Sequence, residues 1–195
     1  MTRRLVVVES LTLDGVMQAP GGPNEDTRGG FEHGGWAAPY SDDVMGREMG
    51  KGMGTSDLLF GRWTYESMYS FWPKQTDSNP FTEVLNQSQK YVASNTLAEP
   101  LPWMNSTLVS GDAAETVAAL KEQPGNDIAV LGSGELLQTL MEDGLVDEYT
   151  LLIHPLVLGS GQRLFREGTY PAELRLDHSV NTTTGVVIAT YKPAR

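Results

Sequence analysis

Short apolar runs that alternate with helix-forming stretches are the feature that most constrains how this chain can fold. Strands are predicted at residues 5–12, 58–60, 89–93, 107–109, 128–131, 149–158 and 185–191. Helices are predicted at 42–53, from 61 onward, and at 79–86, 112–123 and 136–143. This alternation is typical of an α/β fold with a mostly parallel central sheet and helices on both of its faces. No helix separates the last two strands, so the final strand is expected to be antiparallel and at an edge.

Three helix starts carry recognisable capping residues. Ser41 can cap the first helix, and Asn79 followed by Pro80 can open the third. Asp112 and Glu115 resemble a capping box at the start of the fourth helix. These local signals fix where helices begin more firmly than where they end.

Charge and composition exclude several classes of protein. The 195 residues carry 14 Lys and Arg against 25 Asp and Glu, a formal net charge of -11, with no basic cluster. Binding to nucleic acid or to an anionic membrane surface is therefore not expected. Cysteine is absent, which removes disulfides and thiolate metal sites. The apolar run near the N-terminus is too short for a signal peptide or a membrane span, so we expect a cytoplasmic protein with one domain over residues 1–195.

A long Gly- and Pro-rich segment at residues 19–35 precedes Trp36. It is either a functional loop or a surface insertion. Trp36 could line a pocket for a flat heterocyclic substrate, or it could pack in the core or a lid. The three histidines, His33, His154 and His178, are too scattered for a metal site, and none is expected.

Four segments that leave predicted strands carry residues suited to ligand binding: 13–17, 61–64, 94–96 and 132–135. In open parallel sheets, ligands bind beyond the carboxyl ends of the strands. The coincidence of four such segments therefore indicates a ligand site more strongly than any one of them.

Each segment also has a structural interpretation. The glycines of 132–134 could let helix N–H groups reach a phosphate, or could simply allow a turn with positive φ. Arg62 and Thr64 could bind phosphate oxygens, or could be a surface arginine and a capping threonine. The polar run 94–96 could bind a ribose or a phosphate, or could satisfy its own turn.

Taken in order, the motifs at 61–66 (GRWTYE), 90–96 (KYVASNT) and 128–136 (IAVLGSGEL) resemble the dihydrofolate reductase superfamily. The stretch 145–165 (LVDEYTLLIHPLVLGSGQRLF) is similar to the reductase domain of the bifunctional riboflavin-biosynthesis deaminase–reductase and to stand-alone proteins built on that domain. The resemblance covers residues 5–191. It implies a dihydrofolate-reductase-like fold and an NADPH-dependent reductase.

The resemblance also implies which residues of this chain bind the cofactor. Residues Gly61, Arg62 and Thr64 match the helix start that holds the cofactor phosphates. The stretch near the adenosine 2′-phosphate is matched by Ser94, Asn95 and Thr96. The pyrophosphate turn is matched by Gly132, Ser133, Gly134, Glu135 and Leu136. The wall around the nicotinamide is matched by Ser10 and the loop 14–17, which includes Met17.

The substrate and the proton donor stay open at this level. The implied reaction is hydride transfer from NADPH to a small heterocycle, as in a 5-amino-6-(5-phosphoribosylamino)uracil reductase. Asp14, Asp42 and Asp43 are candidate proton donors, beside water, although acids in a first helical turn are also favourable in themselves. The alternatives are a true dihydrofolate reductase and a non-enzymatic nucleotide- or heterocycle-binding protein. The resemblance further implies a homodimer.

Overall fold

A computed structural model describes residues 2–52, 54–76, 79–168 and 171–194. The chain divides into two compact units, each assembled from two stretches of sequence. Unit 1 comprises Met1–Val6 and Gly50–Val146, and unit 2 comprises Val7–Met49 and Asp147–Arg195. The single-domain expectation for residues 1–195 stays a prediction.

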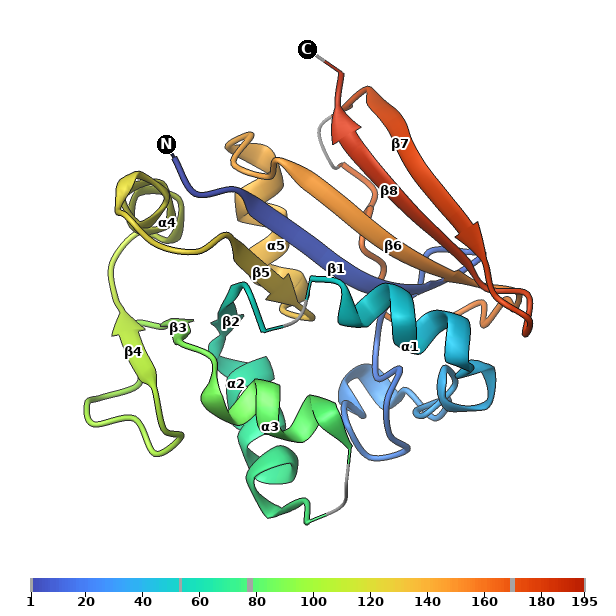
Figure 1. Ribbon diagram of the computed structural model, residues 1–195, viewed down its shortest axis with the longest axis horizontal. Helices are drawn as coiled ribbons and strands as arrows, with labels where there is room; N and C mark the ends of the chain where they lie inside the picture. The colour runs from blue at the N-terminus through green and yellow to red at the C-terminus, as the bar shows by residue number, and fades with distance from the viewer. Residues whose placement is uncertain (1, 53, 77–78, 169–170, 195) are drawn as a thin grey trace. The chain divides into compact units, whose positions relative to one another are not determined.

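The elements follow one another along the chain as Figure 1 labels them. The strands are β1 (Leu5–Thr12), β2 (Asp57–Gly61), β3 (Lys90–Ala93), β4 (Ser106–Val109), β5 (Ile128–Leu131), β6 (Glu148–His154), β7 (Leu174–Asn181) and β8 (Val187–Pro193). The α-helices are α1 (Asp43–Gly50), α2 (Arg62–Phe71), α3 (Pro80–Gln87), α4 (Ala113–Glu122) and α5 (Gly134–Glu142). Short 3-10 turns are η1 (Arg28–Gly30), η2 (Ala38–Tyr40) and η3 (Trp72–Lys74). In the described residues the strand order is β4-β3-β2-β5-β1-β6-β8-β7, which confirms the predicted mixed sheet.

Unit 1 contains the parallel part of the sheet. β2 pairs in parallel with β3 on one side and with β5 on the other, and β3 pairs in parallel with β4. Leu59 stands opposite Tyr91 of β3 and Val130 of β5. Because these strands are parallel, their carboxyl ends and the turns that follow them lie at one edge of the sheet.

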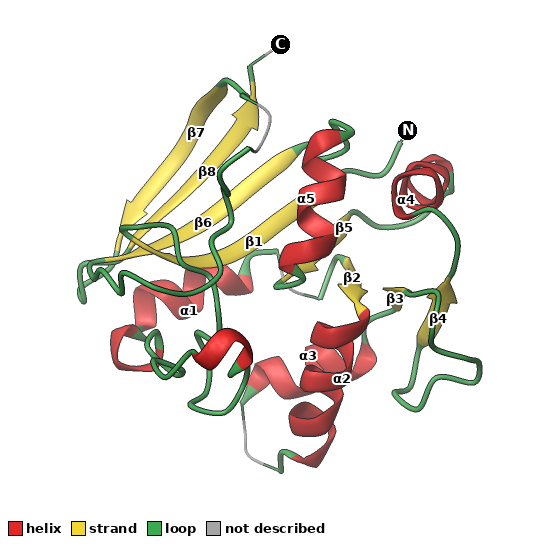
Figure 2. Cartoon of the chain, turned by 180° about the vertical axis from the view of Figure 1, so that it is seen from behind, coloured by secondary structure: helices red, strands yellow, loops and turns green. Residues whose placement is uncertain are grey.

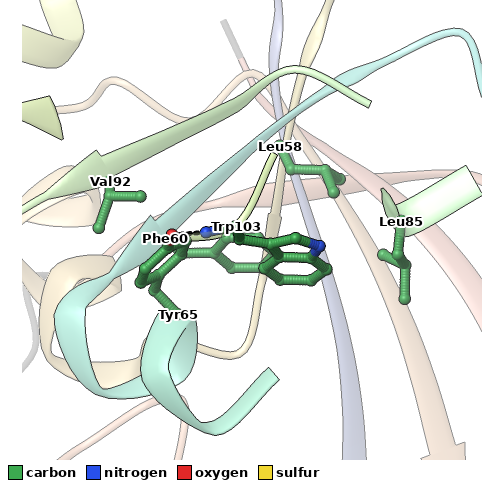
Figure 3. Close-up of a cluster of buried hydrophobic side chains, with 6 residues drawn as sticks. All are labelled: Leu58, Phe60, Tyr65, Leu85, Val92 and Trp103. Atoms are coloured by element: carbon green, nitrogen blue, oxygen red, sulfur yellow. Dashed lines mark hydrogen bonds between the residues drawn. The ribbon is translucent and has the colours of Figure 1, made fainter. Parts of the chain in front are cut away.

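An aromatic cluster fills the core of unit 1. It consists of Leu58, Phe60, Tyr65, Leu85, Val92 and Trp103 (Figure 3). The rings of Phe60 and Trp103 are stacked, with centroids 6.3 Å apart. The backbone N–H of Trp103 donates to the hydroxyl of Tyr65 at 3.0 Å, so the phenol is satisfied inside the core. This packing fixes α2, which carries Tyr65, against the strands.

Unit 2 contains the antiparallel part of the sheet, in which β8 pairs with both β6 and β7. Figure 1 shows β7 and β8 as a long hairpin beside β6. The last strand, β8, is antiparallel as predicted. It is not the edge strand, because β7 lies outside it, and β7 was not predicted from the sequence. Every residue of β7 is exposed or half-buried, so its sequence lacks the apolar run by which the other strands were found.

The Gly- and Pro-rich segment of unit 2 is a packed loop. Figure 2 draws it mostly as loop, and it contains the 3-10 turn η1. Phe31 and Trp36 are buried with Val16 and Ala19 in a separate apolar cluster. Gly161 lies so close to this cluster that a Cβ there would be 2.7 Å from both Phe31 and Val16. The segment is thus held by its own core, unlike a loose surface insertion.

Most predicted elements occur within a few residues of their expected positions, and the differences have local causes. α1 is capped by Asp42, whose Oδ1 accepts from the N–H of Met45 at 2.8 Å, and Ser41 is not the cap. This helix ends at Gly50, while its expected end at Met53 lies outside the described residues. β6 ends at His154, because the following proline cannot donate to the sheet. In the described part of the chain, no helix is long and apolar enough to cross a membrane.

A buried lysine joins the end of α3 to the core of unit 1. Lys90 is 0% exposed, and its Nζ lies 4.6 Å from the ring centroid of Trp103. Its Nζ also donates to the carbonyl oxygens of Asn86, Ser88 and Met104, at 3.1, 2.7 and 3.1 Å. Burial lowers the pKa of Lys90 to about 8, which still leaves it mostly charged at neutral pH. The ammonium therefore joins the end of α3 to the backbone at Met104 through three carbonyl groups.

Truncating this lysine should destabilise the protein. We expect Lys90→Ala to lower the free energy of unfolding by roughly 2–4 kcal/mol, because it removes a buried stem and the donor to three carbonyl groups. Urea unfolding followed by tryptophan fluorescence measures the change. Lys74→Ala, at an exposed lysine of the same unit, is the control and should change stability by no more than about 0.5 kcal/mol. Equal effects of the two substitutions would contradict the role given to Lys90.

Candidate functional site

Two strand-to-helix turns of unit 1 are hydrogen-bonded to each other. The first joins β2 to α2 at Gly61, and the second joins β5 to α5 through Gly132 and Ser133. The N–H of Gly61 donates to the Ser133 hydroxyl at 3.0 Å. The N–H of Ser133 donates to the Thr64 hydroxyl at 2.9 Å. The parallel pairing of β2 with β5 thus places two predicted cofactor segments side by side.

The N-termini of α2 and α5 differ from those of the other helices. The Asn79 side chain caps α3, the Asp112 side chain caps α4, and Asp42 accepts from α1. At α2 and α5 the N-cap residues, Gly61 and Ser133, make no side-chain cap hydrogen bond. Serine is among the preferred N-cap residues, but the Ser133 hydroxyl accepts from the neighbouring turn instead of from its own helix. Both helix dipoles therefore present a positive end that no cap side chain neutralises.

Glycine is required at position 132 in the second turn. Gly132 has φ +62°, and a Cβ at this position would lie 3.1 Å from the Thr64 methyl carbon. Ser133 itself has φ 64° and ψ 43°, a left-handed conformation that is unusual for a residue other than glycine. Such strain persists only where the surroundings enforce it, and it is common at ligand sites.

A cationic group lies beside these turns. Arg62, the first residue of α2, donates to the Thr96 hydroxyl at 2.7 Å and pairs with Glu66 at 3.3 Å. The Ser94 and Thr96 hydroxyl oxygens are 3.3 Å apart. The structure thus brings Arg62, Ser94 and Thr96 together, as the sequence analysis expected. A cation at a helix N-terminus opposes the helix dipole, and a bound anion would offset that cost.

Other predicted residues of unit 1 have structural contacts. Asn95 exchanges two hydrogen bonds with the backbone of Gly111, at 3.1 and 2.6 Å, so its amide holds the turn after β4. Leu136 is buried in α5, while Glu135 is exposed in the first turn of that helix. Gly134 begins α5 and offers backbone alone. Only backbone groups of these α5 residues are suited to an anion.

Asp14, in unit 2, accepts five hydrogen bonds. Its carboxylate accepts from the Thr12 hydroxyl at 2.6 Å, from the Gly159 N–H at 2.9 Å and from the Leu158 N–H at 3.2 Å. Arg163 binds both the carboxylate and the backbone carbonyl of Asp14. The hydrogen bond from Thr12 is the main reason why the pKa of Asp14 falls to about 2. A carboxylate with this pKa holds no proton near neutrality, which favours a role in pinning the loop.

The other two acidic candidates lie at α1. The second oxygen of Asp42 accepts from the backbone N–H and the hydroxyl of Thr183, both at 2.6 Å. The cap bond to Met45 and the hydrogen bonds from Thr183 lower the pKa of Asp42. Asp43 is exposed on the first turn of the helix. Asp42 is thus committed to joining α1 to the turn between β7 and β8.

Trp36 lies in the core of its loop. It is 7% exposed, and its Nε1 donates to the carbonyl of Gln18 at 2.7 Å. Its ring meets that of His154 edge-on, at 5.1 Å between centroids. Met17 is also buried, and Ser10 is half-buried in β1. These contacts favour packing over substrate contact for Trp36 in this conformation.

Gln18, which organises the loop of unit 2, was not found from the sequence. Gln18 donates to the carbonyls of Asp26 and Arg28 and accepts from the N–H of Gln162 at 2.9 Å. It therefore holds both sides of the loop. Nothing in one sequence distinguishes a glutamine whose partner lies 144 positions away from a solvent-exposed one.

The chain matches a known protein family over most of its length. A family model described as the RibD C-terminal domain matches residues 3–188. The chain belongs to the RibD C-terminal domain family. Among curated relatives, the uncharacterized protein YyaP of Bacillus subtilis (strain 168) is 28% identical over 199 residues, covering 97% of this chain and 94% of YyaP. The uncharacterized protein YwjB of the same strain is 37% identical over 70 residues, covering 36% of this chain and 40% of YwjB.

Solved structures show how this RibD-type chain is folded. A protein from Shewanella sp. PV-4, assigned provisionally to riboflavin biosynthesis, has TM-score 0.71 at 23% identity and covers all of both chains. A pyrimidine reductase-like protein from Corynebacterium diphtheriae has TM-score 0.67 at 12% identity, over 99% of this chain and 92% of its own. Dihydrofolate reductase from Enterococcus faecalis, solved with NADP(H), has TM-score 0.64 at 12% identity and covers all of both chains. The predicted dihydrofolate-reductase-like fold is confirmed.

The buried His154 gives unit 2 a measurable pH dependence. Its Nδ1 lies 2.9 and 3.2 Å from the carbonyls of Leu152 and Leu11, so this nitrogen carries the proton. Burial lowers the pKa of His154, and the ring is neutral in the folded protein. The unfolded chain takes up its proton near pH 6.5, so this residue costs stability as the pH falls below about 6.5.

We expect His154→Asn to reduce the loss of stability between about pH 7.5 and 5.5, because the amide can still donate but does not titrate. Urea unfolding at a series of pH values gives the slope of stability against pH for the wild type and for the variant. His178→Asn, at an exposed histidine of the same unit, should keep the wild-type slope. If His154→Asn also keeps it, the buried neutral state is wrong.

Proposed function

We propose that this chain is an NADPH-dependent reductase that transfers hydride to a small heterocyclic substrate. One observation carries the proposal: α2 and α5 begin side by side, and neither is capped by a side chain. Membership of the RibD C-terminal domain family supports it, as does a shared fold with a reductase solved with NADP(H). Two uncapped helix N-termini are suited to the pyrophosphate of a dinucleotide.

The residues present in unit 1 fit such a cofactor. The glycine at 132 lets this turn pack closely against Thr64, because a Cβ there would lie 3.1 Å from the Thr64 methyl carbon. Arg62, Ser94 and Thr96 supply a guanidinium and two hydroxyls suited to a 2′-phosphate. When bound, NADPH supplies the hydride, and the chain's own residues bind and orient it.

The proton that accompanies the hydride comes from water in this proposal. Asp14 and Asp42 are both held as carboxylates by N–H and O–H donors, so neither keeps a proton near neutrality. Ser10 and Met17 are proposed to lie beside the nicotinamide, as the resemblance implies. A homodimer and a cytoplasmic location belong to the same proposal.

The substrate is proposed to be a pyrimidine of the riboflavin-pathway type, close to 5-amino-6-(5-phosphoribosylamino)uracil. A similar fold occurs in a pyrimidine reductase-like protein, which supports this class. A true dihydrofolate reductase would need a carboxylate available for the pterin ring. Both oxygens of Asp42 already accept hydrogen bonds, which favours the pyrimidine class.

Titration with each nicotinamide cofactor tests the proposal. Trp63 is 50% exposed on the first turn of α2, so bound NADPH should quench its fluorescence. We expect saturable, micromolar binding of NADPH and much weaker binding of NADH. Oxidation of NADPH with the pyrimidine intermediate, and not with dihydrofolate, would then identify the reaction. If neither cofactor binds, the reductase proposal fails and a non-enzymatic ligand-binding role replaces it.

The preference for NADPH should depend on Arg62. We expect Arg62→Ala to weaken NADPH binding by about 10- to 100-fold, the value of one charged hydrogen-bonded contact, with little effect on NADH. Arg47→Ala, which removes an exposed arginine from α1, is the matched control and should change neither affinity. Equal losses for NADPH and NADH would show that Arg62 does not bind the 2′-phosphate.

A further inference from the structure

Two hydroxyl side chains, Thr64 and Ser133, link the two turns of unit 1. Each accepts an N–H from the opposite turn: Ser133 from Gly61 at 3.0 Å, and Thr64 from Ser133 at 2.9 Å. We propose that Thr64 and Ser133 form a clasp that positions the two helix N-termini, before any ligand binds, as one anion site. The inference rests on the proposed function and assigns a task to residues that the resemblance gave only as phosphate contacts.

The hydrogen-bond donors and acceptors of the two turns are used in a way that differs from a simple phosphate contact. The N–H groups of Gly61 and Ser133 are both used between the turns, so neither can bind a phosphate without breaking the clasp. Thr64 uses a lone pair in the clasp, which leaves its O–H hydrogen able to donate to a phosphate oxygen. The pyrophosphate is thus met by the helix starts and by the Thr64 hydroxyl, while Ser133 is a positioning residue.

The left-handed backbone of Ser133 supports this assignment. A left-handed conformation is unfavourable for a residue other than glycine, and glycine would adopt φ 64° without that strain. The strain places the hydroxyl 3.0 Å from the Gly61 N–H and away from the first turn of α5. A serine at this position with no other role would be expected to cap its own helix. The diverted hydroxyl both joins the turns and leaves the α5 terminus uncapped.

Preorganisation is the functional consequence. Holding two dipoles at a fixed separation removes the entropy cost of aligning them when the ligand arrives. Loss of the clasp should therefore weaken ligands that span both helix starts and spare ligands that contact Arg62 alone. Because both hydroxyls act in one structure, removing the second should cost little more than removing the first.

Amide hydrogen exchange, followed by NMR without ligand, tests the clasp independently of the cofactor. In the wild type, the amides of Gly61 and Ser133 should exchange slowly. Ser133→Ala should speed exchange at Gly61 at least about tenfold, and Thr64→Val should do so at Ser133, because each loses its acceptor. Thr64→Ser keeps the hydroxyl and should restore protection. Ser70→Ala, at an exposed serine of α2, is the control.

Binding then tests the positioning role. Ser133→Ala, Ser133→Gly and Thr64→Val should each weaken NADPH about tenfold or more and leave the affinity for adenosine 2′-monophosphate unchanged. Ser133→Gly removes the hydroxyl while relieving the backbone strain, so it should stay folded even if Ser133→Ala does not. The double variant Thr64→Val/Ser133→Ala should bind NADPH about as weakly as the weaker single variant.

Each outcome has one meaning. If the wild type shows protected amides but binds no NADPH, the clasp exists and the proposed function is wrong. If the wild type binds NADPH and the variants bind it equally well, the positioning role is overturned. Additive losses, or equal losses for NADPH and adenosine 2′-monophosphate, would overturn it as well. Additive losses would indicate that Thr64 and Ser133 contact the phosphate independently. Equal losses for the two ligands would indicate a general loss of structure.

Discussion

The parallel pairing of β2 with β5 is the constraint on which the arrangement of unit 1 depends. It sets the turns that follow both strands next to each other, so two helices begin at one edge of the sheet. The opposite ends of the strands are fixed by a buried pair, in which the Arg3 guanidinium binds Asp57 and lies over the ring of Tyr91. The register is therefore held at both ends. Removing one partner of such a buried pair leaves an uncompensated charge, so a slip of register is strongly disfavoured.

The sequence predicted the parts of this fold that depend on local chemistry. Asn79 and Asp112 cap α3 and α4 as expected, because a cap and its N–H donor lie within a few residues. β7 was missed, since its residues are exposed or half-buried and leave no apolar run to detect. The grouping of Arg62 with Thr96 followed from the rule that strand ends meet at one edge of a parallel sheet. The hydrogen bond from Ser133 to Thr64 spans 69 residues, and no local pattern encodes it.

The acidic candidates show why residue type alone does not assign chemistry. Asp14 lies in the turn after β1, and Asp42 caps α1. At such positions a carboxylate can serve in catalysis or can accept hydrogen bonds from backbone N–H groups. In the structure both accept hydrogen bonds from several donors, and both have lowered pKa values for that reason. Unit 2 thus uses its acids to organise loops.

Arg62 is unfavourably placed in the fold, at a position where its charge would be useful for binding an anion. Its charge opposes the dipole of the helix it begins, and Glu66 and Thr96 compensate for it at a partly exposed position. In the proposed cofactor site, Glu66 would compete with a phosphate for the guanidinium. This competition would lower the affinity for weakly charged anions more than for a doubly charged phosphate ester. The proposed site would therefore favour a ligand with a strong anion at that position, because only such an anion competes well with the Glu66 carboxylate.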